Sequence, residues 1–363
     1  MSKSETLVIK VGTSVLTRPN QQLDYNVIHQ IVEQVGQLRR ARHRVVLVSS
    51  GAAGASYGLG DFKKERDQVQ RLQMMASVGQ PRLIAIYNDF FREHRITCAQ
   101  ALLTRSDFGD RERYLSIRNV LEGLLRLNIL PIINENDVVA SDALTFGDND
   151  FLSAAVASLV GADKLFLLTS TDGFYQGGDP NVNKKARLVD EVQEITPEMW
   201  ADCQPTLSLG GRGGMYSKLK SAQLASSHGI EVVVASGKEP GVVSRIMEGE
   251  RLGTRFLPTG KRMRSYRLWL RFGAITNGTI AIDAGAEKAL RNNKSLLPAG
   301  IVSMEGDFRK GEVVAIHNPA GQQLGMGVVE ISSDELRDMI SGSREMERSR
   351  EAVHKDRLLM LQG

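Results

Sequence analysis

The feature that most constrains the fold is the alternation of short, uniformly apolar runs with amphipathic segments along residues 1–255. The runs span five or six residues and show no alternation of polar and apolar positions. Between them apolar residues recur every three or four positions, as in residues 27–38 and 115–125, which predicts helices with one apolar face. Strands buried on both faces and separated by helices are typical of parallel sheets. The sequence therefore predicts an α/β fold, a largely parallel sheet sandwiched by helices. The predicted strands are residues 6–10, 45–49, 98–103, 129–133, 164–169 and 231–235.

The composition changes at the basic stretch KRMRSYRLWLR, residues 261–271, which we interpret as a linker. A length of 363 residues suits two domains better than one. Short β-rich segments follow the linker and predict a small, mostly β domain with one helix, residues 286–292. The chain after residue 341 is charged, and we expect it to be partly helical. The expected organisation is a first domain at 1–258, a linker at 259–274, a second domain at 275–353 and a tail at 354–363. The predicted strands of the second domain are residues 278–282, 300–302, 311–316 and 327–331.

Several classes of protein do not fit this sequence. Two cysteines, Cys98 and Cys203, are too few for a disulfide framework or a cysteine-based metal site, which fits a reducing compartment. The N-terminal segment MSKSETLVIKVG resembles neither a signal peptide nor a transit peptide. No apolar stretch approaches the roughly 20 residues of a membrane helix. We therefore expect a soluble, cytoplasmic protein with no membrane partner.

Polar residues follow the predicted strands at the points where those strands end. Lys10 ends the first run, Ser50 and Gly51 follow the second, and Asp137 follows the fourth. Thr169 and Ser170 end the fifth run, and Asn149 and Asp150 open the helix before it. Parallel sheets bind ligands at the carboxyl ends of their strands. We therefore expect these side chains to meet at one edge of the sheet.

A glycine-rich stretch, residues 210–214, precedes a predicted helix that carries Lys218 in its first turns. Backbone N–H groups at such helix starts can hold an anion, and the turn at residues 49–54 offers a second cradle of this kind. Two lysines, several carboxylates and two anion cradles fit phosphoryl transfer, where positioning and charge neutralisation supply most of the catalysis. The Walker A pattern GxxxxGK[ST] is absent, and no GxGxxG follows the first strand. These absences argue against a P-loop enzyme and against a dinucleotide-binding domain.

Taken in order, these motifs resemble the amino acid kinase family, and within it the glutamate 5-kinases. The pair INEND and GDND, residues 133–137 and 147–150, is specific to that branch. The C-terminal part, including GAITNGTIAIDAGAEKAL and GDFRKGEVVAI, resembles a PUA domain. The resemblance covers nearly the whole chain. The other matching stretches are VIKVGTSVLT, VVLVSSGAAGA, ASVGQPRL, ALLTRSDFGDRERYLSIRN, LPIINENDVVA, FGDNDFLSA, GADKLFLLT and GRGGMYSKLKSA.

The resemblance implies ATP-dependent phosphorylation of the γ-carboxylate of L-glutamate, the first step of proline biosynthesis. It implies that Lys10 and Lys218 flank the transferring phosphoryl group and that Asp150 orients both lysines. Mg²⁺ would accompany ATP and be held mainly by the phosphates, so we name no protein ligand. The substrate-binding residues that it implies are Ser50, Gly51, Asp137 and Asn149. The nucleotide-binding residues that it implies are Lys10, Thr169, Ser170, Arg212, Gly213, Gly214, Met215, Tyr216, Ser217 and Lys218.

The resemblance also implies feedback inhibition by proline and assembly into a homo-oligomer, a dimer or a tetramer. The sequence departs from the family pattern around the nucleotide. The family has Leu-Thr-Asp at the nucleotide strand end, where this chain has Thr169 and Ser170. In the glycine loop Arg212 replaces a threonine, and Tyr216 with Ser217 replaces Ser-Thr. The positions assigned to glutamate are intact.

Two alternative functions stay open at this point. The first is another amino acid kinase, of the acetylglutamate, aspartate or carbamate type, although those lack the INEND and GDND pair and the PUA domain. The second is an RNA-binding protein that acts through the PUA-like domain. Residues 281–340 hold six basic and nine acidic side chains, a net charge of −3. This sign is opposite to the basic footprint of a protein that binds the RNA backbone. We therefore do not expect RNA to be the main partner.

Overall fold

The structure, a computed structural model, describes residues 4–140, 149–203, 214–260, 270, 276–341 and 350–361, apart from the side chain of Lys63. The chain divides into two compact units, Met1–Arg105 with Leu115–Arg262, and Ser106–Tyr114 with Met263–Gly363. Within the described ranges no helix is both long enough and apolar enough to cross a membrane.

The first unit is built on an eight-stranded sheet with the order β3-β4-β2-β1-β5-β9-β10-β8. Neighbouring strands from β3 to β9 are parallel, whereas β10 runs antiparallel to β9. In register, Lys10 lies opposite Val48 on one side and Leu167 on the other. The strands are β1 Thr6–Val11, β2 Arg44–Ser49, β3 Cys98–Leu103, β4 Leu130–Glu135, β5 Lys164–Thr169, β8 Glu191–Val192, β9 Glu231–Ser236 and β10 Thr254–Phe256, and a separate hairpin pairs β6 Tyr175–Gln176 with β7 Arg187–Leu188.

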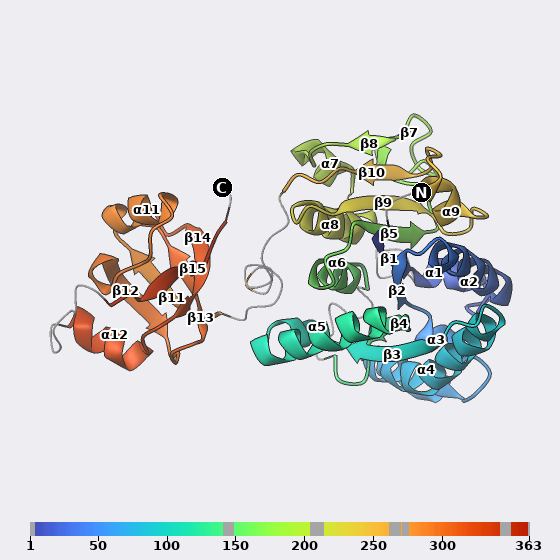
Figure 1. The fold of residues 1–363 in the computed structure, drawn as a ribbon, viewed down its shortest axis with the longest axis horizontal. Helices are drawn as coiled ribbons and strands as arrows, with labels where there is room; N and C mark the ends of the chain where they lie inside the picture. Colours follow the sequence, from blue (N-terminus) through green and yellow to red (C-terminus); the bar gives the residue numbers. More distant parts are fainter. Residues whose placement is uncertain are drawn as a thin grey trace. The chain divides into compact units, whose positions relative to one another are not determined.

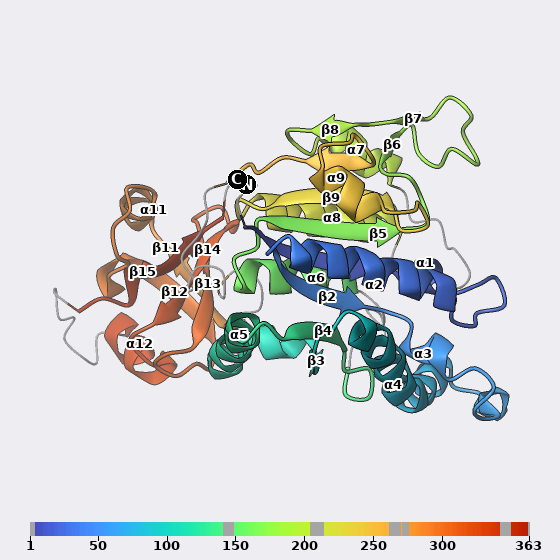
Figure 2. The ribbon, with the colours of Figure 1, turned by 45° about the vertical axis from the view of Figure 1, so that its right-hand side comes forward.

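Helices cover both faces of this sheet, as the views in Figure 1 and Figure 2 show. Helices α6 and α8 pack together on one face, and α2 packs with α4 and α9 on the other. The long α4 contains Pro81 and also contacts the short α3. The helices are α1 Thr13–Leu16, α2 Tyr25–Arg40, α3 Ala52–Ala55, η1 Phe62–Lys64, α4 Gln68–Glu93, η2 Arg105–Phe108, α5 Arg111–Arg126, α6 Asn149–Leu159, α7 Pro197–Asp202, α8 Met215–Ser226 and α9 Val242–Met247.

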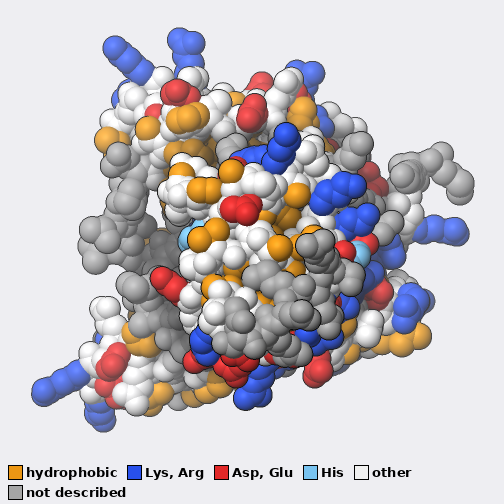
Figure 3. All heavy atoms as spheres, turned by 90° about the vertical axis from the view of Figure 1, so that its left-hand side faces the viewer, with side chains coloured by type: hydrophobic (Ala, Val, Ile, Leu, Met, Phe, Trp, Pro, Cys, Tyr) orange, Lys and Arg blue, Asp and Glu red, His pale blue; other side chains and the backbone are white. Residues whose placement is uncertain are grey.

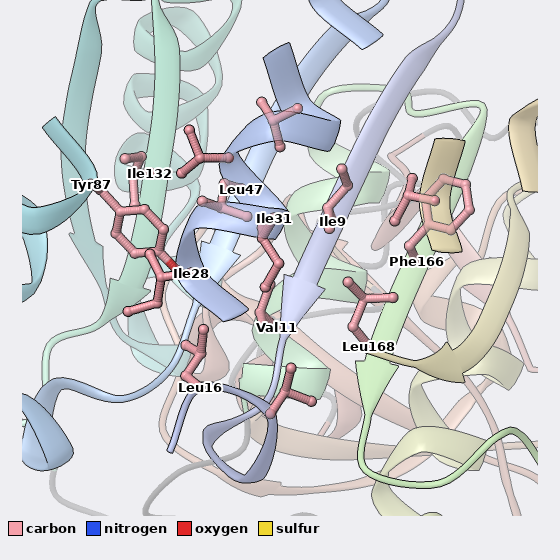
Figure 4. Packing of buried hydrophobic residues seen from close by; sticks show 14 of the residues in the cluster. Ile9, Val11, Leu16, Ile28, Ile31, Leu47, Tyr87, Ile132, Phe166 and Leu168 are labelled. Atoms are coloured by element: carbon pink, nitrogen blue, oxygen red, sulfur yellow. The ribbon is translucent and has the colours of Figure 1, made fainter. Parts of the chain in front are cut away.

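The core of the first unit lies between the sheet and the α2 and α4 layer. Apolar side chains from β1, β2, β4 and β5 pack against those helices, with Tyr87 between Ile28 and Ile132 in Figure 4. Strands β1, β2, β4, β5 and β9 are buried along most of their length, because helices cover both sides of the sheet. The expectation of a buried strand is wrong for β3, which lies at the edge of the sheet and leaves Gln100 and Leu102 exposed. All six strands predicted from the apolar runs are present, with ends that differ by at most two residues. The predicted parallel, helix-covered sheet is therefore confirmed.

The second unit contains a five-stranded sheet in the order β12-β11-β13-β14-β15. One apolar cluster joins this sheet to α11 and α12. The four strands and the helix predicted here are present, shifted by up to four residues, but the helix α12 was not predicted. The elements are β11 Thr276–Ile282, α11 Ala284–Arg291, η3 Pro298–Gly300, β12 Ile301–Gly306, β13 Val313–His317, β14 Gln323–Val329, α12 Ser333–Ile340 and β15 Val353–Met360.

The expectation of a partly helical tail is wrong for residues 353–360. These residues form β15, which pairs antiparallel with β14. Val353, Leu358 and Leu359 are buried in the unit, so burial of these apolar side chains outweighs the charged residues between them. We therefore propose that the second domain continues through residue 361 rather than ending at 353. The expected linker at 259–274 lies almost entirely outside the described residues.

Basic and acidic side chains are interspersed on the face drawn in Figure 3. In the second unit, ion pairs link side chains of opposite charge, among them Arg350 with Glu335 and Lys310 with Glu330. A surface with both signs mixed does not provide the single-sign field that attracts a nucleic-acid backbone. The arrangement agrees with the negative charge counted for this part of the sequence.

Candidate active site

The sheet order brings the polar strand ends together as predicted. Strands β2, β1 and β5 are direct neighbours, and all three run in the same direction. Lys10 lies near the end of β1, Ser50 follows β2 and Thr169 ends β5. Helix α6 begins at Asn149 and contacts β1, β2, β4 and β5. The carboxyl edge of the central strands is therefore where the candidate site forms.

A buried cluster of three charged side chains lies at this edge. Asp150, in the first turn of α6, is 1% exposed. Its Oδ1 lies 2.5 Å from Nζ of Lys10, and its Oδ2 lies 3.1 Å from Nζ of Lys218. One carboxylate between two ammonium groups leaves the trio with a net charge of +1. The structure therefore brings the three predicted catalytic residues together.

The ionisation of Asp150 depends on these lysines. Burial alone would raise the pKa of this carboxyl, because the charged form loses hydration. The charges of Lys10 and Lys218, and hydrogen bonds from Lys10 and Ser217, outweigh burial and hold its pKa well below the usual range. Asp150 is therefore a carboxylate at any pH at which the protein works.

Helix α8 supplies the other side of the cluster. It begins at Met215 after Gly214, which offers no side-chain cap. The hydroxyl of Ser217 donates to Oδ2 of Asp150 at 2.7 Å, with the Gly214 carbonyl 3.0 Å away as a second acceptor. Helices α6 and α8 pack side by side, so Lys218 reaches Asp150 from the neighbouring helix. N–H groups at a helix start without a side-chain cap are suited to holding an anion, and α8 begins in this way.

Asn149 forms a second, uncharged cluster beside the first. Its Nδ2 donates to the Ser49 carbonyl at 3.2 Å, to Oγ of Ser50 at 2.9 Å and to Oδ1 of Asn134 at 3.0 Å. The backbone carbonyl can only accept, so the orientation of this amide is determined. Oδ1 of Asn149 is buried and has no hydrogen-bond partner among the described residues. A buried acceptor of this kind is suited to a donor on a bound molecule.

Two further predicted substrate residues lie beside this cluster in the chain. Gly51 has φ of +94° and precedes α3, a left-handed conformation that favours glycine. Asp137 comes two residues after the end of β4 and is partly buried. Burial raises the pKa of the Asp137 carboxyl from 3.8 to about 6. A positive group bound next to this carboxyl would stabilise its charged form and lower its pKa.

The predicted nucleotide residues are only partly described. Thr169 is buried at the end of β5, and its carbonyl accepts the N–H of Gly237 at 2.8 Å, whereas Ser170 is exposed. Tyr216 is half exposed and meets Trp200 edge-to-face at 5.2 Å between ring centroids. Arg212 and Gly213 lie outside the described residues.

Two residues that matter in this arrangement were not among the predicted site residues. Asn134 is buried and bonds to Asn149, and it lies in the same motif as Asp137, which could have revealed it. No pattern in the sequence connects Trp200 with the site. Its partner Tyr216 lies on the other side of the glycine-rich stretch, and the contact between the two rings forms only in the folded protein.

The described side chains do not form a protein-based metal centre. No cluster of three or more His, Cys, Asp or Glu residues there could hold a metal ion. Asp150 already pairs with two ammonium groups, so its oxygens are poor candidates for coordinating a cation.

Comparison with known sequences gives the same picture over the whole chain. Residues 5–236 match the amino acid kinase family and residues 278–347 match the PUA domain. The chain is 39% identical to a glutamate 5-kinase of Thermoanaerobacter pseudethanolicus, with 98% of each protein covered. It is 43% identical to one from Herpetosiphon aurantiacus, covering 93% of this chain and 91% of the relative. It is 41% identical to one from Photorhabdus laumondii, covering 99% of this chain and all of the relative.

Among solved structures, a carbamate kinase from Giardia lamblia bound to AMP-PNP superposes with a TM-score of 0.52 and 17% identity. The superposition covers 71% of this chain and 99% of the carbamate kinase. At this identity the similarity concerns the fold alone. It supports the same layered α/β architecture for the first unit.

Proposed function

The chain belongs to the amino acid kinase family, among the glutamate 5-kinases that carry a C-terminal PUA domain, and from this premise we propose that it transfers the γ-phosphoryl group of ATP to the γ-carboxylate of L-glutamate. The product is L-glutamyl 5-phosphate, which enters proline biosynthesis. The observation that carries this function is the buried Lys10–Asp150–Lys218 cluster at the carboxyl edge of the sheet.

The chemistry needs charge neutralisation more than proton transfer. A γ-carboxylate oxygen of glutamate attacks the γ-phosphorus, the bond from that phosphorus to the bridging oxygen breaks, and ADP leaves with the electron pair. Glutamate is already ionised at neutral pH, so no general base is required. Lys10 and Lys218 neutralise the negative charge of the transferring group. Asp150 pairs with both ammonium groups and so keeps them at the same site.

The uncharged cluster fits the substrate end of the reaction. Oδ1 of Asn149, which has no hydrogen-bond partner among the described residues, is suited to the ammonium group of glutamate, and Asp137 would pair with the same group. Ser50, together with the backbone of Gly51, would hold a carboxylate of the substrate. The N–H of Ser50 itself donates to the Val11 carbonyl at 3.1 Å. Thr169, Ser170 and the start of α8, from Gly214 to Lys218, would hold the nucleotide, and Arg212 and Gly213 would belong to that loop. Mg²⁺ would accompany ATP and supply further charge neutralisation, and we name no protein ligand for it.

Further properties are proposed from the family alone. We propose that proline competes with glutamate in the first domain, that the protein assembles into a homodimer or homotetramer, and that it works in the cytoplasm. Another amino acid kinase activity is not favoured, because the relatives of similar length are named glutamate 5-kinases. RNA binding is not favoured either, because the second domain has an excess of acidic side chains.

Trapping the acyl phosphate with hydroxylamine tests this function directly. The full-length protein is incubated with ATP, Mg²⁺ and hydroxylamine, together with L-glutamate, L-aspartate or N-acetyl-L-glutamate at equal concentrations. We expect hydroxamate to form fastest with L-glutamate and to disappear in the Lys218→Ala variant. Faster turnover of aspartate or N-acetylglutamate would contradict the assignment.

A further inference from the structure

Helix α4 carries two polar side chains that bond to the ends of two different strands. Tyr87 is fully buried, and its hydroxyl lies 2.9 Å from Oγ of Ser49, the last residue of β2. Gln80 Oε1 accepts a hydrogen bond of 2.8 Å from Nδ2 of Asn134 in β4. The two residues are seven positions apart, or two helical turns, so they share one face of α4.

These two bonds belong to one closed chain of hydrogen bonds. Asn134 Oδ1 accepts from Nδ2 of Asn149, and the same Nδ2 also donates to the Ser49 carbonyl. The path therefore runs from Gln80 through Asn134, Asn149 and Ser49 to Tyr87, and the backbone of α4 closes it. We call these five residues the amide ring. Asn149 is the member that both branches share.

The direction of each bond in the amide ring follows from its neighbours. Ser49 Oγ donates its single hydrogen to the Ser50 carbonyl at 2.9 Å, so Tyr87 must be the donor toward Ser49. Asn134 Oδ1 also accepts the N–H of Glu135 at 2.9 Å, so Nδ2 of Asn134 must face Gln80. Burial raises the pKa of Tyr87 to about 12, so this hydroxyl keeps its proton. Reversing any amide of the ring would place two donors or two acceptors together.

Close contacts with α3 also fix the position of α4 beside the site. Gly79 packs so closely on α3 that an added Cβ would lie 1.8 Å from the Ala52 carbonyl oxygen. One turn away, Arg82 donates to the Ala55 carbonyl at 3.3 Å. Figure 4 shows the Tyr87 ring among the core side chains beneath the strands. Helix α4 is therefore held against the layer that carries Ser50 and Gly51, and cannot shift independently of it.

We propose that Gln80 and Tyr87 are positioning residues for glutamate recognition, which act through the amide ring to hold the Asn149 amide in its binding orientation. This inference rests on the proposed function and deepens it. Neither residue needs to touch the substrate. Both act on the uncharged half of the site and leave the lysine–aspartate cluster unchanged.

The test uses two substitutions that remove one ring bond each without opening a large cavity. Tyr87→Phe loses only the hydroxyl, and we expect the KM for glutamate to rise about fivefold, as for one lost buried hydrogen bond. Gln80→Met leaves the Asn134 amide without its acceptor, and we expect a rise of roughly tenfold. The KM for ATP should stay within about twofold in both variants. The double variant should change less than the product of the single effects, because both act through Asn149.

Two controls separate positioning from general loss of stability. Tyr25→Phe removes a hydroxyl that also contacts α4, through Arg82 at 3.2 Å, but lies outside the amide ring. Ile31→Val weakens the same core and should lower thermal stability to a similar degree. Neither should alter the KM for glutamate. In an Asn149→Ala background, Tyr87→Phe and Gln80→Met should each change kcat/KM for glutamate by less than about twofold.

Hydrogen exchange provides a readout that does not depend on the reaction. Peptides that span α6, residues 149–159, should exchange faster in Tyr87→Phe and Gln80→Met than in the two controls. Unchanged exchange of α6, or effects on KM that persist in the Asn149→Ala background, would overturn the proposal. If exchange changes as expected but the wild-type protein does not phosphorylate glutamate, the proposed function fails while the role of the ring in holding α6 stands.

Discussion

The two halves of the site are built on consecutive residues and differ in almost every physical respect. Asp150 is ionised and pairs with two buried lysines, whereas Asn149 is neutral and bonds to a serine, an asparagine and a backbone carbonyl. Charge–charge interactions act strongly and with little directional demand in a buried site. Amide hydrogen bonds are weaker but depend on orientation. The charged half is therefore suited to stabilising phosphoryl transfer, and the neutral half to recognising one substrate.

Helix geometry explains how neighbouring residues serve such different halves. Successive residues of an α-helix are rotated by about 100°, so Asn149 and Asp150 leave α6 in different directions. Asp150 reaches β1 and α8, whereas Asn149 reaches the ends of β2 and β4. A single helix start thus ties the two halves together. The comparison predicts that damage to one half should appear in kcat and damage to the other in the KM for glutamate.

The largest effect is expected from removing either lysine of the charged half. Lys10→Ala and Lys218→Ala should each lower kcat by roughly 10²-fold or more, the scale of losing one donor that acts in the transition state. Each variant also leaves the buried Asp150 carboxylate with only one cation, so some loss of thermal stability should accompany it. Steady-state release of ADP measures kcat. If the variants changed only the KM for glutamate, the charged and neutral halves of the site would not have separate roles.

A somewhat smaller effect is expected from the neutral half. Asn149→Ala removes the buried acceptor and an amide group whose two hydrogens serve three acceptors, so kcat/KM for glutamate should fall by roughly 10- to 100-fold. The KM for ATP should change by less than about threefold. Asn181→Ala, in an exposed loop of the same unit, is the matched control and should be neutral. Initial rates at varied glutamate and at varied ATP separate the two constants.

The neutral half should also be sensitive to pH through Asp137. Burial raises its pKa to about 6, so below that pH the carboxyl becomes neutral and cannot pair with the ammonium group of glutamate. We expect kcat/KM for glutamate to fall about tenfold per pH unit below 6, and this dependence to vanish in Asp137→Asn. Asp150, whose pKa lies far lower, should contribute nothing in this range.

Asp137 should make stability and activity depend on pH in opposite directions. Between its ordinary pKa of 3.8 and the raised value of about 6, folded Asp137 keeps a proton that the unfolded chain has released. The contribution of this group to stability therefore decreases as pH rises through that window. Thermal unfolding of the wild type and Asp137→Asn from pH 4 to 7 should show the difference. A wild-type curve that gains stability relative to the variant on raising the pH would refute the assignment of this pKa.

The smallest effect is expected from Ser217, which supports the charged half without carrying charge. Ser217→Ala removes one hydrogen bond to Asp150 but leaves both lysine pairs in place. We expect kcat to fall about three- to fivefold, in line with roughly 1 kcal/mol for one hydrogen bond. Ser217→Thr, which keeps the hydroxyl, should recover most of the rate. A decrease of 10²-fold in Ser217→Ala would mean that the hydroxyl contacts the transferring group itself.

Much of this arrangement could be predicted from the sequence for physical reasons. Strands buried on both faces appear as uniform apolar runs, so β5 was predicted to the residue. The bounds of β3 were also predicted to the residue, although this edge strand is only partly buried. The parallel sheet then places Lys10, Ser50 and Asp150 at one edge, although the pairing of Asp150 with Lys10 and Lys218 came from the family resemblance. The strand β15 was missed because charged residues interrupt its apolar positions.

The amide ring could not be predicted from pattern. Gln80 and Tyr87 occupy ordinary helical positions, and Asn134, the partner of Gln80, lies 54 residues away. A polar side chain within a helix gives the same sequence signal whether it faces solvent or a buried partner. Only the packing of α4 against the strand ends reveals which of the two applies.

The most direct test of the division between the two halves is a paired kinetic measurement on Lys218→Ala and Asn149→Ala. Both substrates are varied for each variant, and kcat is compared with the two KM values. We predict that Lys218→Ala lowers kcat by roughly 10²-fold or more with the KM for glutamate little changed, and that Asn149→Ala acts on kcat/KM for glutamate with the KM for ATP little changed. If both variants alter the same constants in the same proportion, the site does not divide between charge and recognition, and the account is wrong.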